Sequence, residues 1–448
     1  MIPFPISEKS PVEHGGPLPT EADCVIIGGG VIGICTAFYL AKAGLRPVVL
    51  EKGRVAGEQS SRNWGWIRQQ GRDPAELPIM IEANRLWREL EPELSEDIGL
   101  RQSGLLYLAD TDKDLAYFEE FMALAREHGL DTELLGPEGV GKLLPSAKNR
   151  WLGGMHTASD MKAEPWLAVP ALARLAVRSG AVIVENCAAR RLDMAGGKVA
   201  GVFTEQGRIA APSVVLAGGA WSSLFLAAHG VRIPQLSVRA SVAATEALPL
   251  VYEGGAVDTT GAFRRRADGG YTLAAADFHE FLIGPDAFRH LRKFIPQILA
   301  NPTANRFFPA SPTGYPDAWT TPRRWRADEV SPFERMRVLN PRPAMKALGK
   351  VARQFASDHP SLGEVRLASS WAGMIDTMPD VVPVVDHAPS LPGLIVATGM
   401  SGHGFGIGPG FGRVIASMVR GEPSGHDLSR FRISRFAKGE KLVTGPSL

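Results

Sequence analysis

Cysteine is scarce in this chain of 448 residues, which contains only Cys24, Cys35 and Cys187. The three are odd in number, and none belongs to a C-x-x-C motif or to a close Cys/His pair. The pattern argues against a disulfide framework and against a zinc site, and we expect no metal. Few cysteines suit a reducing compartment, and the opening residues MIPFPISEKSPVEHGG lack a basic region followed by an apolar run. We therefore expect no signal peptide and a cytoplasmic protein.

A strong excess of one charge sign is also missing, because 49 Lys and Arg residues stand against 47 Asp and Glu residues. The formal net charge of +2 gives no reason to expect a nucleic-acid partner. Two basic clusters, at residues 264–266 and 323–326, are therefore interpreted as solvated faces or as the rim of a substrate site.

Uncharged stretches long enough to span a membrane are few. Residues 24–41 just reach the length at which a transmembrane helix has to be considered, and residues 388–412 contain eight glycines, which suit a spanning helix poorly. Both are better explained by glycine loops, so we expect no transmembrane segment. Hydrophobic residues make up 45% of the chain and charged residues 21%, which is typical of a soluble globular protein. The length predicts two or three domains.

Glycine is abundant, and its placement near the N-terminus is informative. Residues 23–28 form a β-branched run typical of a buried strand, residues 32–43 suit a helix, and residues 47–50 suit a second strand that ends in Glu51. The glycines between the first strand and the helix have G-x-G-x-x-G spacing: Gly28, Gly30 and Gly33. This order and spacing predict a dinucleotide-binding unit.

Each part of this unit has a physical role. Gly28 permits a tight turn, Gly30 lets the backbone approach a pyrophosphate, and Gly33 lets helix and strand pack closely. The helix N-terminus offers N–H groups to the phosphates, while Glu51 can accept hydrogen bonds from ribose hydroxyls.

Three further segments favour FAD over NAD. Residues 181–222 are predicted as a strand, a turn at Gly196–Gly197, two more strands and a glycine turn. Residues 391–412 predict a strand, a glycine loop and the start of a helix, and residues 57–72 form a polar loop directly after the acidic strand end. Such loop-to-helix junctions point backbone N–H groups at an anion.

From about Asp23 to Arg420, the chain resembles the FAD-dependent amine and amino-acid oxidoreductases, the family of D-amino-acid oxidase, glycine oxidase and sarcosine oxidase. The resemblance implies that the first motif and the post-strand loop bind FAD, through Gly28, Gly30, Val31, Ile32, Gly33, Glu51, Lys52, Ser60, Ser61, Arg62, Asn63 and Gly65. It also implies cofactor contacts from the later segments, at Ala189, Gly218, Gly219, Trp221, Gly373, Gly402, His403, Gly404, Phe405 and Gly406.

The reaction implied by the resemblance is oxidation of a C–N bond, in which hydride passes to flavin N5 and the resulting imine is hydrolysed. The substrate would be an amine or an N-substituted or D-amino acid, and the acceptor would be oxygen or an electron-transfer partner. His403 lies in the flavin loop, where a cationic imidazole could stabilise reduced flavin; alternatively only its backbone matters. Alternative functions are an FAD-dependent 2-hydroxy-acid dehydrogenase and a flavin-bearing scaffold or assembly subunit. The sequence does not predict the oligomeric state.

One segment departs from the family pattern. Residues 371–383 keep the frame of a motif whose arginine grips the substrate carboxylate, but Ile375 stands at the arginine position and Asp376 follows it. Asp376 could therefore bind a cationic substrate group or act as a structural cap. Alternatively, another arginine takes over the carboxylate: Arg68, Arg239 or Arg264. The cysteine and the histidine that attach flavin covalently in some relatives are also missing, so we expect non-covalent FAD.

The predicted fold class is α/β plus α+β, with a Rossmann-like FAD-binding domain and a second, antiparallel-sheet substrate domain. The FAD-binding domain is expected to be discontinuous (20–78, 150–232 and 362–435), and the substrate domain to comprise 79–149 and 233–361. Residues 237–247 and 262–274 are predicted as antiparallel strands of the second domain. Trp66 and Tyr271 are candidate cavity aromatics; alternatively they belong to the core, as aromatic residues in strands more often do. Residues 301–342 are expected to form a long loop or lid.

Overall fold

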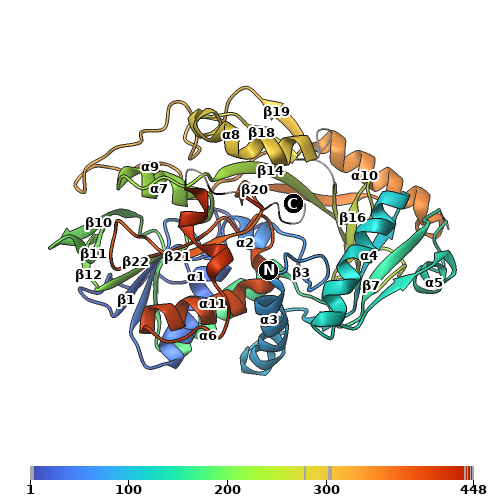
Figure 1. The fold of residues 1–448 in the computed structure, drawn as a ribbon, viewed down its shortest axis with the longest axis horizontal. Coiled ribbons are helices and arrows are strands. Elements are labelled where there is room, and N and C mark those ends of the chain that lie inside the picture. Colours follow the sequence, from blue (N-terminus) through green and yellow to red (C-terminus); the bar gives the residue numbers. More distant parts are fainter. Residues whose placement is uncertain are drawn as a thin grey trace.

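A six-stranded sheet of short, buried strands organises one half of the molecule, as the computed structural model shows (Figure 1). The structure describes residues 5–148, 150–276, 279–300, 305–437, 440, 442, 443 and 445. Five strands pair in parallel and β21 is antiparallel at the edge. In sheet order the strands are β21 (Val384–His387), β22 (Leu394–Thr398), β13 (Ser213–Leu216), β1 (Cys24–Ile27), β2 (Pro47–Leu50) and β9 (Val182–Val184). The predicted Rossmann-like arrangement is confirmed.

Closely packed helices cover this sheet, and glycine makes their approach possible. The helices are α1 (Val31–Lys42), α3 (Leu77–Leu90), α6 (Pro165–Arg178) and α11 (Gly404–Arg420). A Cβ atom on Gly412 of α11 would lie 2.4 Å from the Cβ of Cys35 in α1, and one on Gly408 would lie 2.5 Å from Val31 Cγ2. Because such distances are far below van der Waals contact, α11 can lie this close to α1 only where it carries no side chain.

A three-stranded antiparallel sheet lies at the outer end of this half (Figure 1). Its strands are β10 (Ala189–Ala195), β11 (Lys198–Thr204) and β12 (Gly207–Ala210). The predicted turn at Gly196 and Gly197 joins the first two, and both glycines have positive φ angles, of 58° and 77°. A second small sheet, β3-β8-β4, joins segments far apart in the chain: β3 (Trp66–Ile67), β4 (Arg101–Gln102) and β8 (Met161–Lys162).

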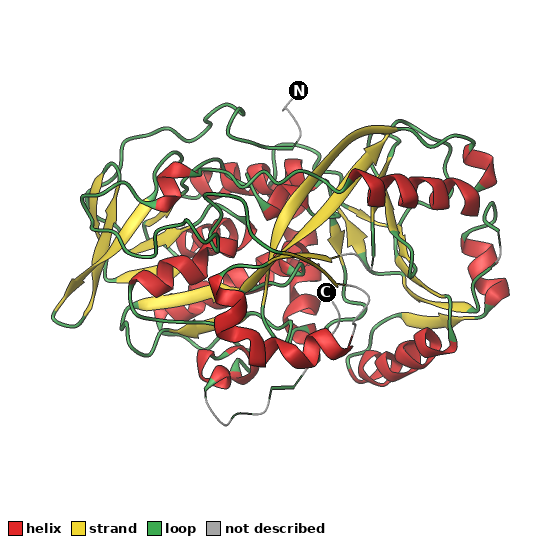
Figure 2. Cartoon of the chain, turned by 90° about the horizontal axis from the view of Figure 1, so that it is seen from above, coloured by secondary structure: helices red, strands yellow, loops and turns green. Residues whose placement is uncertain are grey.

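The other half is built on a ten-stranded sheet. Its two longest strands are antiparallel partners, and Figure 2 shows long strands reaching from the middle of the molecule toward one end. The strands are β5 (Leu105–Ala109), β6 (Thr132–Leu135), β7 (Gly153–Thr157), β14 (Leu236–Thr245), β15 (Gly255–Val257), β16 (Ala262–Arg265), β17 (Tyr271–Ala274), β18 (His279–Leu282), β19 (Asn305–Phe308) and β20 (Leu367–Thr377). Strands β7 and β20 fall in segments that the sequence assigns to the FAD-binding domain, yet they pair within this sheet, since β20 follows β14 from Leu236 to Thr245.

The remaining helices lie around the two halves. They are α2 (Gln59–Arg62), α4 (Asp112–Glu127), α5 (Pro137–Leu143), α7 (Ser222–Ala228), α8 (Pro285–Ala300), α9 (Pro332–Arg335) and α10 (Met345–Asp358), with short 3₁₀ turns η1 (Glu91–Glu93), η2 (Gly219–Trp221), η3 (Pro360–Leu362), η4 (Ser429–Phe431) and η5 (Ile433–Phe436). In the described part of the chain, no helix is both long and apolar enough to cross a membrane.

The predicted loop at 301–342 contains β19 and α9 and otherwise lacks regular structure in its described part; residues 301–304 lie outside the described residues. Tyr315 and Trp325 from this segment are buried in the core beside the six-stranded sheet. The Trp325 indole donates a hydrogen bond to the Arg190 carbonyl at 2.8 Å. This part of the segment is therefore packed against the cofactor half.

The contact between α1 and α11 leads to a stability prediction. We expect Gly412→Ala to lower the free energy of unfolding by roughly 1–3 kcal/mol, because the added methyl group would overlap Cys35. The control is Gly349→Ala in α10, where the nearest atom is the terminal Arg353 Nη1 at 3.4 Å. That variant should gain about 0.5–1 kcal/mol from the better helix propensity of alanine. Urea denaturation of both variants checks the pair, and equal effects would contradict the packing argument.

Candidate active site

A cavity of about 440 Å³ lies where the two halves of the molecule meet. It is lined by the C-terminal ends of strands in the six-stranded sheet, by the N-termini of α1 and α11, and by one face of β14 and β20. Most of the residues predicted to bind FAD or substrate line it: Gly28, Gly30, Val31, Ile32, Glu51, Lys52, Ser60, Arg62, Asn63, Trp66, Arg68, Ala189, Gly218, Gly219, Trp221, Gly373, Asp376, Gly402, His403, Gly404, Phe405 and Gly406.

Six predicted residues are not among those that line the cavity: Gly33, Ser61, Gly65, Tyr271, Arg239 and Arg264. A Cβ on Gly33 would lie 2.1 Å from the Gly28 carbonyl oxygen, so Gly33 serves the close packing of helix and strand. Gly65 has a φ of +80°, and its Cβ would lie 2.3 Å from the Ala163 carbonyl oxygen. Ser61 is fully buried within α2.

Tyr271 is a core residue, and its prediction as a cavity aromatic is wrong. Its side chain is fully buried and packs against Phe263 and Phe355. The hydroxyl accepts a hydrogen bond from the Val251 N–H and donates one to the Pro249 carbonyl. The alternation of β17 therefore points Tyr271 away from the cavity and into the centre of the second half.

The glycine turn before α1 has the predicted tight geometry. Gly28 has a φ of +116°, and a Cβ there would lie 2.3 Å from the Ala217 carbonyl oxygen. Helix α1 begins after Gly30 without a side-chain cap, and the Ser60 hydroxyl accepts the Val31 N–H at 2.9 Å. The post-strand loop thus lies directly against the N-terminus of α1, where an anion is favoured by the helix dipole.

Glu51 ends β2 at the edge of the cavity. Its carboxylate accepts the backbone N–H groups of Gly29 at 2.8 Å and Gly53 at 2.7 Å. Burial raises the pKa of Glu51 to about 7, since removing a carboxylate from water disfavours its charged form. Two hydrogen bonds fix its position, and a carboxylate has further lone pairs for ribose hydroxyls.

A cluster around Lys52 completes this end of the cavity. The ammonium group lies 2.6 Å from the Glu58 carboxylate and 4.5 Å from the centre of a Trp221 ring. The Trp221 indole N–H in turn donates to Glu58. Glu58 lines the cavity but was missed by sequence reasoning, because its partner Trp221 lies 163 residues away and no local motif marks it.

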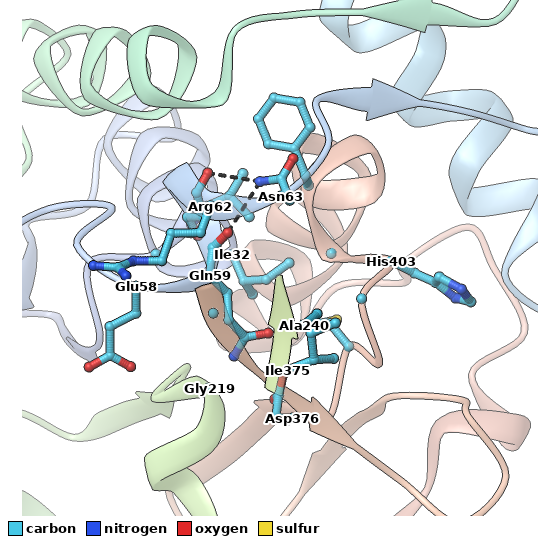
Figure 3. A pocket seen from close by; sticks show the side chains of 18 of the residues that line it. Ile32, Glu58, Gln59, Arg62, Asn63, Gly219, Ala240, Ile375, Asp376 and His403 are labelled. Carbon is cyan, nitrogen blue, oxygen red and sulfur yellow. Dashed lines mark hydrogen bonds between the residues drawn. The ribbon is translucent and has the colours of Figure 1, made fainter. Parts of the chain in front are cut away.

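The loop residues Arg62 and Asn63 hold the chain together around the cavity (Figure 3). The Arg62 guanidinium donates to the Ala372 carbonyl at 2.9 Å and to Asn340 Oδ1 at 2.8 Å. The Asn63 amide donates to the carbonyls of Gln59 and Ser60. Asn63 therefore ties the post-strand loop to itself, and Arg62 ties this loop to β20.

Asp376 is buried and fully engaged by the protein. Its carboxylate accepts the Gly399 N–H at 2.7 Å, the Gln235 amide at 3.1 Å and the Thr398 hydroxyl at 3.2 Å. Burial raises the pKa of Asp376. Of the two interpretations open from the sequence, this geometry favours the structural cap, which fixes the loop after β22. The neighbouring Ile375 places an apolar side chain at the cavity wall (Figure 3).

The three candidate arginines have very different surroundings. Arg264 forms a buried, two-pronged ion pair with Glu164, and Arg239 pairs with Glu280 at 2.6 Å. Neither lines the cavity, and the interpretation of cluster 264–266 as a solvated face is wrong for Arg264, which is 1% exposed. Arg68 does line the cavity and has no carboxylate partner within ion-pair distance among the described residues. One of its guanidinium N–H groups donates to the Gln70 carbonyl.

His403 lies in the wall of the cavity just before α11 (Figure 3). Its Nδ1 is 3.5 Å from a Glu76 carboxylate oxygen, and its carbonyl accepts hydrogen bonds from Arg72. Burial lowers the pKa of His403 to about 4, so the imidazole is neutral at pH 7. A cationic imidazole at this position is therefore not favoured.

The cavity suits FAD both by its shape and by buried polar atoms that have no hydrogen-bond partner within the protein. Buried polar atoms without a hydrogen-bond partner are unusual, and two belong to residues that line this cavity: Trp66 Nε1 and His403 Nε2. At the other end, glycines leave the backbone of the α1 turn open to a pyrophosphate. The residues that would hold the adenosine half, the phosphates and the flavin thus follow one another along one cavity.

Solved structures resemble this chain over nearly its full length. L-amino acid deaminase from Proteus myxofaciens, in a complex with anthranilate, superposes with a TM-score of 0.90 and is 31% identical, covering 95% of this chain and 96% of that one. L-amino acid deaminase from Proteus vulgaris gives a TM-score of 0.89 at 26% identity, covering 95% and 100% of the two chains.

Curated sequences are also similar to this chain. Sarcosine oxidase subunit beta of Rhizobium meliloti is 26% identical over 425 residues, which are 93% of this chain and 89% of that protein. Human mitochondrial sarcosine dehydrogenase is 30% identical over 238 residues, or 51% of this chain, so the match spans about a quarter of that longer relative. The family model described as FAD dependent oxidoreductase matches residues 23–418. The chain therefore belongs to the FAD-dependent oxidoreductase family, and its cofactor is FAD.

Proposed function

We propose that this oxidoreductase oxidises the C–N bond of an amino acid or N-substituted amino acid that binds through its carboxylate. The observation that carries this proposal is Arg68, a cavity arginine without an acidic partner among the described residues. A guanidinium binds a carboxylate through two parallel hydrogen bonds. The names of the relatives, L-amino acid deaminase and sarcosine oxidase, support an amino-acid substrate.

The bound flavin supplies the oxidation, in which hydride leaves the carbon beside nitrogen and the nitrogen lone pair forms the C=N bond of an imine. Water then adds to the imine carbon, and ammonia or an amine leaves to give a carbonyl compound. Arg68 would hold the carboxylate and so orient the reacting C–H bond. Neutral His403 would line the cavity without adding charge, and the N-terminus of α11 would present N–H groups to the cofactor.

The same surroundings favour one protonation state of the substrate nitrogen. No carboxylate in the described part of the cavity stands ready for a substrate ammonium, because Asp376 and Glu58 are held by protein groups and Glu51 would be taken by the ribose of FAD. A neutral amine, whose lone pair is free for C=N formation, is therefore the favoured substrate form. The electrons would pass on to oxygen or to an electron-transfer partner.

Anaerobic absorbance tests the proposal directly. Amino acids, N-methyl amino acids, polyamines, cyclic amines and 2-hydroxy acids are added to the oxidised holoprotein, and the flavin band is followed. We expect bleaching by amino acids or N-methyl amino acids, with ammonia or amine as a product. Readmission of air then separates an oxidase, which recovers its colour rapidly, from a dehydrogenase. Bleaching only by amines without a carboxylate, or only by 2-hydroxy acids, would overturn the proposal.

A variant of Arg68 tests the carboxylate site. Arg68→Met should lower kcat/KM for the best amino-acid substrate roughly ten- to hundredfold, since a hydrogen-bonded charged contact contributes about 1.5–3 kcal/mol. The flavin content should stay normal, because Arg68 holds no predicted phosphate or ribose contact. Arg68→Lys keeps the charge but loses the two-pronged geometry and should be intermediate. An unchanged kcat/KM in Arg68→Met would show that the substrate carboxylate does not bind at Arg68.

The cofactor is proposed to be bound without a covalent bond. Cysteine is one attachment residue, and none of the three cysteines lines the cavity: Cys24, Cys35 and Cys187 are all buried elsewhere. Ser61 and Arg62 stand at the place in the post-strand loop where some relatives attach flavin through histidine. Flavin should therefore be removed when the protein is unfolded and return when FAD is added to the refolded chain.

Glu51 gives this reversible binding a specific pH dependence. Ribose hydroxyls that donate to its carboxylate favour the charged form, so bound FAD lowers a pKa that burial has raised to about 7. Binding then releases a proton, and the affinity for FAD should increase as the pH rises from about 5.5 to 8. Titration of apoprotein by fluorescence quenching measures this trend. Glu51→Gln should bind FAD more weakly and lose most of the trend; a variant that keeps it would contradict the role of Glu51.

A further inference from the structure

We infer that the outer end of the cavity is a subsite for a large apolar, above all aromatic, side chain of the amino-acid substrate. This inference rests on the proposed function and concerns residues that no motif marks. Beyond Arg68, the cavity continues toward α4 and is walled there by the aromatic side chains of Tyr107, Tyr117 and Phe118.

The three rings form one connected wall. Tyr107 on β5 lies 6.2 Å from Phe118 on α4 between ring centres, and Tyr117 lies 6.2 Å from Phe118. Phe118 is 4% exposed and packs in a small core with Phe121 and Met155, whereas Tyr117 is 38% exposed. The inner member of the wall is thus fixed by packing, and Tyr117 forms its outer edge.

The carboxylate site and this wall are adjacent. The Arg68 guanidinium carbon lies 6.0 Å from the Tyr107 ring centre. Gly71 leaves room between them, because a Cβ there would lie 3.2 Å from Tyr107 Cε2 and 3.3 Å from Arg68 Nη1. In an amino acid the carboxylate and the side chain branch from the same carbon. A substrate held by Arg68 can therefore place its side chain against the aromatic wall.

The acidic groups at this end are already occupied, which argues against a basic side chain. Asp114 accepts the N–H groups of Asp110 and Thr111 in the capping box of α4. Asp258 pairs with Arg150 and accepts hydrogen bonds from Trp151 and Gly261. Neither carboxylate is left to hold a substrate cation.

Small and apolar residues continue the lining at this end. Val257 on β15 lies beside Tyr107 on the neighbouring strand β5, and Thr259, Ala275 and Ala276 also line the cavity. Small side chains beside the aromatic rings leave room for an apolar group, and aromatic pairs add about 0.5–1.5 kcal/mol beyond the apolar area that they bury. Size and apolar character of the side chain should therefore set the specificity.

The decisive test uses ligand binding to the holoenzyme, independent of turnover. Benzoate and acetate are titrated, and each dissociation constant is taken from the perturbation of the flavin absorption band. The wild type should bind benzoate at least tenfold more tightly than acetate. Tyr117→Ala should weaken benzoate binding roughly five- to tenfold and change acetate binding less than twofold. The matched control is Phe288→Ala, an exposed aromatic on α8 outside this cavity, which should change neither value.

Substrate kinetics provide the second readout. In the same variants, kcat/KM is compared for phenylalanine and alanine of the configuration that bleaches the flavin, and thermal melting checks the fold. A loss confined to phenylalanine in Tyr117→Ala supports the subsite. Equal losses for both amino acids, or benzoate binding untouched by the substitution, would overturn the subsite while leaving the proposed function intact. If neither carboxylate perturbs the flavin and no amino acid bleaches it, the proposed function itself fails.

Discussion

The close approach of α1 and α11 is the constraint on which the cofactor half depends. Glycines at Gly408 and Gly412 let α11 lie against Val31 and Cys35, at distances that exclude any side chain. As a result, the N-termini of two separate helices open on the same cavity, one at Gly30 and one at His403. Two helix dipoles then favour negative charge at two points along a single elongated cofactor.

A second constraint is the way in which buried charge is distributed. Arg62, Arg72 and Arg264 are buried, and each is held by carbonyls or carboxylates of the protein: Arg62 ties the post-strand loop to β20, and Arg72 binds Glu76 and the His403 carbonyl. A buried cation without partners would be costly, so these contacts stabilise both the fold and the cavity walls. Arg68 differs from these three arginines, because it lines the cavity and its one side-chain hydrogen bond among the described residues goes to the Gln70 carbonyl.

The cofactor half could be predicted from the sequence because its signals are local. Strand, glycine turn, helix and Glu51 follow one another within about thirty residues; Gly28, Gly30 and Glu51 line the cavity, and Gly33 lies where helix and strand pack. The substrate side could not be predicted in the same way. In a short strand, the sequence does not distinguish a core tyrosine such as Tyr271 from an aromatic residue that lines a cavity. The structural role of Asp376 depends on hydrogen bonds from Gln235 and Thr398, which are distant in the sequence. Gln235 is brought to Asp376 by the pairing of β14 with β20, and Thr398 by the place of β22 in the six-stranded sheet.

The cofactor half and the substrate side are built from different elements, which explains how one fold can change its substrate without losing its cofactor. Helix α4 is held by a capping box at its start and by an apolar underside that packs Phe118 and Phe121 on β5 and β7. These contacts involve none of the glycine turns that form the FAD site. Of the α4 residues that line the cavity, Phe118 and Asp114 also hold the helix in place, whereas Tyr117 is 38% exposed. Tyr117 can therefore vary while the sheet, the helix and the cofactor site stay in place, and the proposed specificity depends on this outer residue.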